Sequence, residues 1–228
     1  MNIAFLGYGN MAKALGGRFV TMKDTEVTVA GRDPTKAEAL AQELGSACKS
    51  VATMAEAVAD ADAVVLATPH HAVFDAIATA GGPSAFAGRI VIDVNNPLPR
   101  YADGDFTLGT YDDHGKPSAG SLSLAEAIQA ALPDATVVKA FNTAQAEVWT
   151  LDPMRPHDNR PFVFPICGND ANAKAVVERW VTHMGGGAWD VGGIEYASQL
   201  ESLAAMTIQL LFKGRGPLTV FNLIEHTC

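Results

Sequence analysis

Short apolar runs alternate along the chain with segments in which apolar residues recur at helical spacing. Residues 2–7 (NIAFLG) form the first run, which is typical of a strand buried on both faces. The same pattern predicts further strands at 26–30, 62–67, 89–94, 135–140, 162–167 and 187–191. Between them, the helical spacing predicts helices at 10–22, 34–44, 71–79, 121–131 and 170–183. Strands and helices that alternate in this way predict an α/β fold with a doubly wound parallel sheet.

The last part of the chain departs from this alternation and shows only a helical period. The apolar residues of this part share one predicted helix face: Leu200, Leu203, Ala204, Ile208 and Leu211. We expect the turn at 214–217 to end this helix and to begin a last one. The chain is therefore predicted to divide into a dinucleotide-binding domain, 1–191, and a small C-terminal helical extension, 192–228. An extension of this size is too short to form a core alone, so its apolar face is either core, a substrate cover or a dimer seam.

Two irregular polar stretches interrupt the pattern, at 95–120 and 151–161. Loops of this length inside compact domains are usually functional or mobile.

Composition narrows the class of protein. The 228 residues are 48% hydrophobic and 18% charged, as in a globular protein, and the net charge of −9 argues against nucleic acid or an anionic membrane as partner. No apolar run approaches the ~20 residues that span a bilayer, and no basic leader follows Met1, so we expect a cytoplasmic protein. The cysteines, Cys48, Cys167 and Cys228, are too scattered for a disulfide framework or a metal site, and Cys167 is expected to be a buried small hydrophobe.

The first strand leads directly into a glycine loop that is typical of dinucleotide binding. Gly7-Tyr8-Gly9-Asn10-Met11-Ala12 has the form G-x-G-x-x-A, with a strand before it and a helix after it. In such a loop the first glycine permits the tight turn, and the second lets a pyrophosphate approach the backbone at the helix N-terminus. The sequence therefore predicts a Rossmann-type domain rather than another α/β protein with a glycine-rich turn.

The end of the second predicted strand indicates which dinucleotide is bound. An NAD site needs a carboxylate there, whereas this strand ends in Gly31-Arg32. The planar guanidinium of Arg32 matches a 2′-phosphate, and Lys36 adds a second positive charge one helical turn later. Asp33 weakens the argument slightly, and the alternative is that both cations are solvated surface charges. We therefore predict NADP(H) rather than NAD(H).

The ends of the later strands carry polar side chains where the nicotinamide half of the cofactor is expected. Thr68-Pro69-His70-His71 follows one strand, and the two histidines are expected over the cofactor rather than as a metal pair. Asn95 and Asn96 follow another strand and either contact the cofactor or serve only as turn formers before Pro97.

Five segments occur in a characteristic order along the chain, at residues 7–11, 31–32, 93–97, 138–143 and 167–170. Together they resemble the NADPH-dependent coenzyme F420 reductase family (F420H2:NADP oxidoreductases) and are similar to the cytosolic reductase domain of membrane ferric reductases. The resemblance spans nearly the whole chain, and its last two segments are more specific than the glycine loop. The stretches 95–120 and 151–161 depart from the compact archaeal F420 enzymes. Pyrroline-5-carboxylate reductases share only the N-terminal pattern.

The resemblance implies homodimerisation and hydride exchange between NADPH and a deazaflavin or flavin. It implies that the cofactor is contacted by residues 8–11, Gly31, Arg32, Lys36 and Ala140, and also by His70 and Asn95. It places the F420 pocket near Phe141, Asn142 and the C-terminal helices.

No Ser/His/Asp or paired-carboxylate arrangement is recognisable, so the sequence names no catalytic residue. Hydride transfer between two bound rings needs none, because the cofactors carry the chemistry. An alternative is an NADPH-dependent reductase of a small carbonyl or imine, for which His70, His71 or Lys139 would donate a proton. A non-catalytic NADP(H) sensor is a third interpretation.

Overall fold

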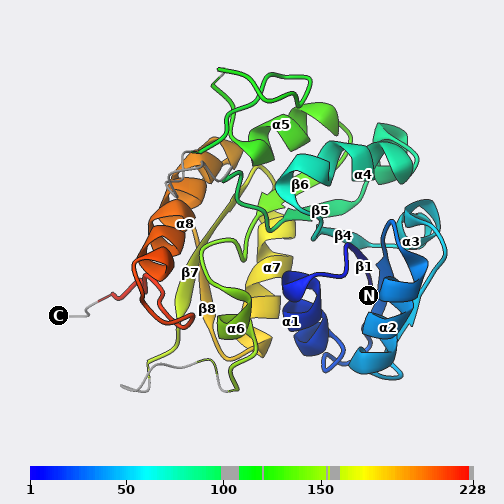
Figure 1. Ribbon diagram of the computed structural model, residues 1–228, viewed down its shortest axis with the longest axis horizontal. Helices are drawn as coiled ribbons and strands as arrows, with labels where there is room; N and C mark the ends of the chain where they lie inside the picture. The colour runs from blue at the N-terminus through cyan, green and yellow to red at the C-terminus, as the bar shows by residue number, and fades with distance from the viewer. Residues whose placement is uncertain (99–107, 120, 153, 155–159, 226–228) are drawn as a thin grey trace.

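The computed structural model describes residues 1–98, 108–119, 121–152, 154 and 160–225. A single eight-stranded sheet runs through the molecule in the order β3-β2-β1-β4-β5-β6-β7-β8, with helices on both faces (Figure 1). The order reverses next to β1, as in doubly wound sheets that bind ligands at that point.

The strands agree closely with the apolar runs. They are β1 (Asn2–Leu6), β2 (Glu26–Ala30), β3 (Cys48–Ser50), β4 (Ala63–Leu66), β5 (Ile90–Asp93), β6 (Thr136–Lys139), β7 (Val163–Gly168) and β8 (Gly187–Asp190). The short strand β3 was missed because two of its three residues, Lys49 and Ser50, are polar.

The helices follow the predicted spacing, with four of them shortened at one end and two added. They are α1 (Asn10–Phe19), α2 (Pro34–Leu44), α3 (Met54–Ala59), α4 (Val73–Thr79), α5 (Leu124–Ala131), α6 (Ala146–Trp149), α7 (Ala171–His183) and α8 (Ala197–Phe212). The short helix α3 begins at a capping box, in which Thr53 Oγ1 accepts from the Glu56 amide and the Glu56 carboxylate accepts from the Thr53 amide. Neither α3 nor α6 is long enough to show a helical period in the sequence.

Alternate residues of the strands point to opposite faces of the sheet and build two hydrophobic cores. Phe5 belongs to the core covered by α1, α2, α6 and α7, whereas Leu6 belongs to the core covered by α3, α4, α5 and α8. Both side chains are fully buried. Burial on both faces explains why the strands are continuous apolar runs.

The sheet is not parallel throughout. β7 pairs antiparallel with β6, and β8 then pairs parallel with β7. The predicted doubly wound parallel sheet is confirmed except at this one step, where β6 and β7 run antiparallel. Residue patterning alone does not distinguish the direction of a strand that is buried on both faces.

The prediction of a last helix after Pro217 is also wrong. Residues 217–225 form a turn followed by irregular chain, and the side chain of Asn222 binds the edge of β7, where its Oδ1 accepts from the Val163 amide at 2.8 Å. Cys228 and most of 151–161 and 95–107 lie outside the described residues. No helix of the described chain is long and apolar enough to cross a bilayer.

Gly7 provides a test of the turn between β1 and α1. Its φ is +126°, and a Cβ at this position would lie 2.3 Å from the Ala67 carbonyl oxygen at the end of β4. Gly7→Ala is therefore expected to lower the free energy of unfolding by more than about 2 kcal/mol, measured by denaturant titration. At Gly9 a Cβ meets no atom within 4 Å. Gly9→Ala should accordingly unfold within about 1 kcal/mol of the unaltered protein, and equal losses in both variants would contradict this account.

Candidate functional site

A cleft of about 630 Å³ opens at the carboxyl ends of the strands around β1. It brings together eleven of the predicted cofactor residues: Gly7, Tyr8, Gly9, Asn10, Met11, Gly31, Arg32, Lys36, Thr68, Pro69 and Asn95. Two others do not line it. Ala140 is fully buried behind the sheet edge, and His70, half-buried, lies in the 3₁₀ turn before α4.

The glycine loop leaves open space where a bound anion is expected. Gly9 is the residue that precedes the first turn of α1, and it is exposed. Since nothing lies within 4 Å of the position of its missing Cβ, a ligand can approach the backbone there. Beside it, the ring of Tyr8 lies against Gly31, where any Cβ would come within 2.3 Å of that ring. This contact fixes the loop against the end of β2.

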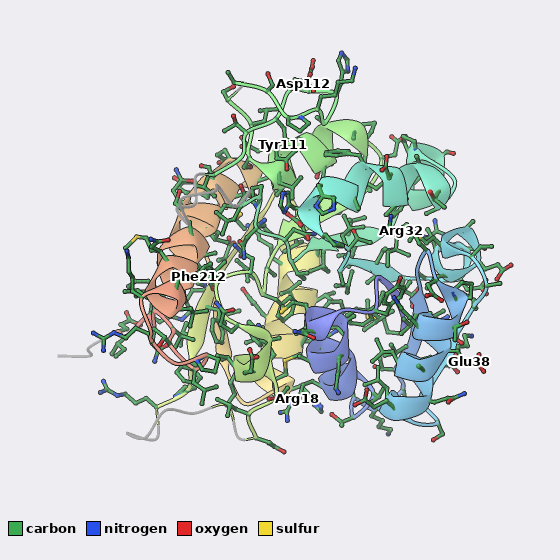
Figure 2. All side chains as sticks on the ribbon, viewed as in Figure 1. Arg18, Arg32, Glu38, Tyr111, Asp112 and Phe212 are labelled. Atoms are coloured by element: carbon green, nitrogen blue, oxygen red, sulfur yellow. The ribbon has the colours of Figure 1, made fainter. Side chains whose placement is uncertain are left out.

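Arg32 is exposed at the end of β2 and lies in the space between α4 and the pair α2 and α3 (Figure 2). Asp33, whose negative charge weakens the argument for a phosphate at Arg32, has a structural role as the cap of α2. Its Oδ1 accepts from the amides of Thr35 and Lys36 at 3.1 and 3.3 Å. Lys36 Nζ lies 3.8 Å from Asp33 Oδ2, whereas Arg32 has no hydrogen-bond or ion-pair partner among the described residues. Arg32 is therefore available to an anion.

Apart from Asn96, the opposite wall of the cleft comes from residues that sequence reasoning did not assign to the cofactor. Its residues are Met54 of α3, Ala72, Asp75, Ala76 and Thr79 of the α4 segment, and Val94 and Asn96 after β5. In this wall, the hydroxyl of Thr68 is buried and has no hydrogen-bond partner among the described residues. A buried hydroxyl without a partner is costly, which indicates a ligand atom at this position.

A second cavity, of about 250 Å³, adjoins the cleft. The two share Asn10, Met11, Val94 and Asn96. Phe141 and Asn142, the residues predicted for the acceptor, line the second cavity together with Ile208 of α8. The structure thus places both predicted groups of residues next to one another.

Two amides connect the ends of β5 and β6 at the boundary of the cavities. Asn96 Nδ2 donates to the Asn142 carbonyl at 2.9 Å, and Asn142 Nδ2 donates to Asn96 Oδ1 at 2.9 Å and to the Leu200 carbonyl at 3.1 Å. Asn95, buried beside them, donates from Nδ2 to the Leu66 carbonyl at 2.8 Å. Both asparagines are therefore more than turn formers before Pro97, since their side chains join three elements.

Below this boundary lies a buried charge cluster of Asp93, Lys139 and Glu201. Asp93 and Lys139 are neighbours in the register of β5 and β6, and Glu201 enters from α8. Lys139 Nζ donates to Asp93 Oδ2 at 2.7 Å, to the Asn95 carbonyl at 2.5 Å and to Glu201 Oε1 at 2.9 Å. Burial lowers the pKa of Lys139, but the two carboxylates outweigh it and leave that pKa raised. Burial also raises the pKa of Glu201, against the opposing effect of Lys139.

These contacts exclude Lys139 as the proton donor of a carbonyl or imine reductase. Its side chain is completely buried and all three of its N–H donors are occupied. The remaining candidates lie beside the cleft rather than in it, because neither His70 nor His71 lines either cavity. Burial, followed by the neighbouring His71, lowers the pKa of His70.

Cys167 is fully buried, as expected, and burial raises the pKa of its thiol to about 12. In the described part of the chain, no three His, Cys, Asp or Glu side chains gather in a way that could hold a metal ion.

The charge cluster had a signal in the sequence. Asp93 and Lys139 each end an otherwise apolar strand, and Glu201 interrupts the apolar face of a helix. Charged residues at such positions are rarely buried unless they are paired.

Comparison with known proteins agrees with this geometry. Residues 2–97 match the family model described as NADP oxidoreductase, coenzyme F420-dependent. The chain is similar to Metalloreductase STEAP3 of Rattus norvegicus, with 27% identity over 203 residues, which cover 88% of this chain and 36% of that protein. The chain thus spans only about a third of the length of that relative.

Two solved structures are similar over nearly their whole length. A candidate F420-dependent NADP-reductase from Arthrobacter sp. FB24 shares 29% identity at a TM-score of 0.82, covering 98% of this chain and 99% of that one. A hypothetical protein from Sinorhizobium meliloti shares 28% identity at a TM-score of 0.68, covering 99% of this chain and 96% of that one. A pyrroline carboxylate reductase from Plasmodium falciparum, 10% identical with a TM-score of 0.58 over 93% of this chain and 66% of that one, shows only the shared fold.

The glycine loop, the strand that carries it and the wall after β5 all lie within residues 2–97, the part of the chain that is similar to the family of NADP oxidoreductases described as coenzyme F420-dependent.

Proposed function

We propose that the protein transfers a hydride between NADPH and a deazaflavin (F420) or flavin-like acceptor. The observation that carries the proposal is the pair of adjoining cavities that share Asn10, Met11, Val94 and Asn96. Two flat rings, one in each cavity, would meet at these residues, and hydride transfer needs such contact more than it needs an acid or base.

The larger cleft fits NADP(H). The open space at Gly9 and the N-terminus of α1 suit a pyrophosphate, and Arg32 suits the 2′-phosphate. The unpartnered hydroxyl of Thr68 suits a polar group of the nicotinamide half. When bound, the cofactor supplies the hydride.

In this proposal the chain's own residues bind, orient and exclude water. Asn96 and Asn142 hold the ends of β5 and β6 together, and so fix the boundary at which the rings meet. Ile208, from α8, covers the second cavity on the side of the extension and limits access of water. Phe141 and Asn142 would contact the acceptor.

The acceptor assay tests this directly. When the protein is mixed with NADPH and either F420 or FMN, it is expected to oxidise NADPH, which is monitored by the loss of the absorbance of the reduced nicotinamide. A small carbonyl or imine compound in place of the acceptor should give no turnover. Tight NADPH binding without oxidation by any flavin or deazaflavin would favour the sensor instead.

Arg32→Glu tests the choice of dinucleotide. Loss of the guanidinium should lower the affinity for NADPH by about a hundredfold or more, because only NADPH carries the 2′-phosphate. The affinity for NADH should change several times less. Titration of each dinucleotide by fluorescence measures both affinities. Lys49→Glu, an exposed cation away from the cleft, is the matched control and should leave both unchanged. An equal loss for NADPH and NADH would refute the role of Arg32.

We further propose that a second copy of the chain covers the outer face of α8. Met206, Leu210 and Leu218 are 57%, 36% and 50% exposed there or just after it, and Figure 2 shows Phe212 on the same helix at the edge of the molecule. Several exposed large apolar side chains close together are typical of an interface. Sedimentation should give a dimer, and Met206→Glu should shift it toward the monomer. Ala130→Glu, exposed on α5, should not.

A further inference from the structure

The charge cluster of Asp93, Lys139 and Glu201 holds two carboxylates against one ammonium, and its three side chains are at most 2% exposed. Such a cluster is neutral only if one carboxylate carries a proton. Its hydrogen bonds show whether either one does.

All four carboxylate oxygens of the cluster accept hydrogen bonds from N–H donors. Asp93 Oδ1 accepts from the amide and Nδ2 of Asn95, both at 3.0 Å, while Asp93 Oδ2 and Glu201 Oε1 both accept from Lys139. The fourth oxygen, Glu201 Oε2, lies 3.4 Å from the Leu124 amide, which donates to it. A protonated carboxyl must donate, and no acceptor for such a proton is found among the described residues. Burial and the nearby Asp93 raise the pKa of Glu201, but the charge of Lys139 and the hydrogen bonds from Lys139 and the Leu124 amide oppose that rise. The hydrogen bonds therefore assign a charge to both carboxylates and leave the cluster with one excess negative charge.

No neighbouring group among the described residues cancels this charge. Tyr111 and Cys167 stay neutral near pH 7, because burial raises the pKa of each to about 12. Lys174, the other cation in this region, pairs with Asp190 at 2.7 Å. The excess charge is also poorly screened by solvent, because the cluster is buried.

The cluster lies directly behind the wall of the cofactor cleft. Asn95, which lines the cleft, binds Asp93 through both its backbone and its side-chain nitrogen. Gly9 and Arg32 mark the phosphate end of that cleft, so the wall formed by Val94, Asn95 and Asn96 belongs to the other, nicotinamide end. The ends of β5 and β6 meet α8 here, because Lys139 of β6 contacts both Asp93 of β5 and Glu201 of α8.

A dihydronicotinamide ring is neutral, and it gains one positive charge when its C4 hydride, two electrons with one proton, moves to the acceptor ring. A fixed negative charge nearby stabilises the charged ring and the transition state that leads to it. We propose that the charge cluster, through the carboxylate of Glu201, makes the site bind NADP⁺ in preference to NADPH and so makes bound NADPH a stronger hydride donor. The inference rests on the proposed binding of NADP(H) in this cleft.

Glu201→Gln and Glu201→Met test the inference by removing the excess charge. The first keeps an oxygen that accepts from Lys139, and the second keeps only the volume. In both, the ratio of the dissociation constant of NADP⁺ to that of NADPH, measured by calorimetric titration, is expected to rise about 3- to 20-fold. Glu195→Gln makes the same change at an exposed position just before α8 and should leave the ratio within about twofold.

The ratio distinguishes electrostatics from simple loss of structure, because damage to the fold would weaken both forms of the cofactor together. If both Glu201 variants fold, bind both forms and keep the ratio of the unaltered protein, the inference is overturned. If neither variant folds, the inference is tested by the affinities of the unaltered protein for NADP⁺ and NADPH. It should bind NADP⁺ at least as tightly as NADPH, at low salt and at about 0.5 M salt alike, and a clear preference for NADPH would overturn the inference. Failure of the unaltered protein to bind either form would instead refute the proposed function.

Discussion

The ammonium of Lys139 imposes the constraint on which this end of the molecule depends. A buried ammonium needs an acceptor for each of its three N–H donors, and it finds them on β5, on the segment after β5 and on α8. Because Asp93 in turn binds Asn95, and Leu200 beside Glu201 binds Asn142, one charge fixes the relative positions of the sheet edge, the cleft wall and the C-terminal helix. The predicted extension is thus joined to the first part of the chain by buried polar contacts as well as by apolar packing.

Polar contacts of this kind are also where sequence reasoning was least complete. The strands and the long helices were predictable because burial on two faces makes a strand uniformly apolar, and burial on one face gives a helix its period. The buried face of α8 was only partly predicted, since two of its members, Glu201 and Thr207, are polar. The missed elements, β3, α3 and α6, are too short to show any period.

The candidate site also has a part that the sequence predicts and a part that it does not. The positions of the glycine loop and Arg32 in the cleft were predictable, because each has a local signature that is typical of phosphate binding. The wall that faces them, from Met54 to Thr79, consists of small and apolar side chains that could equally belong to a core. Their part in the cleft follows from tertiary packing and leaves no mark in the order of residues. His70 lines neither cavity, because a position after a strand end does not determine which way a side chain turns.

The antiparallel direction of β7 affects how the family resemblance at residues 167–170 is interpreted. β7 runs against its neighbour, so the residues that follow it lead away from the edge that carries the cleft. The segment Cys167-Gly168-Asn169-Asp170 is one of those that carry the family resemblance, yet its side chains serve the backbone. Asn169 accepts from the Ile194 amide, and Asp170 caps α7. The resemblance at these positions is explained by the turn that follows β7 and says little about the electron acceptor.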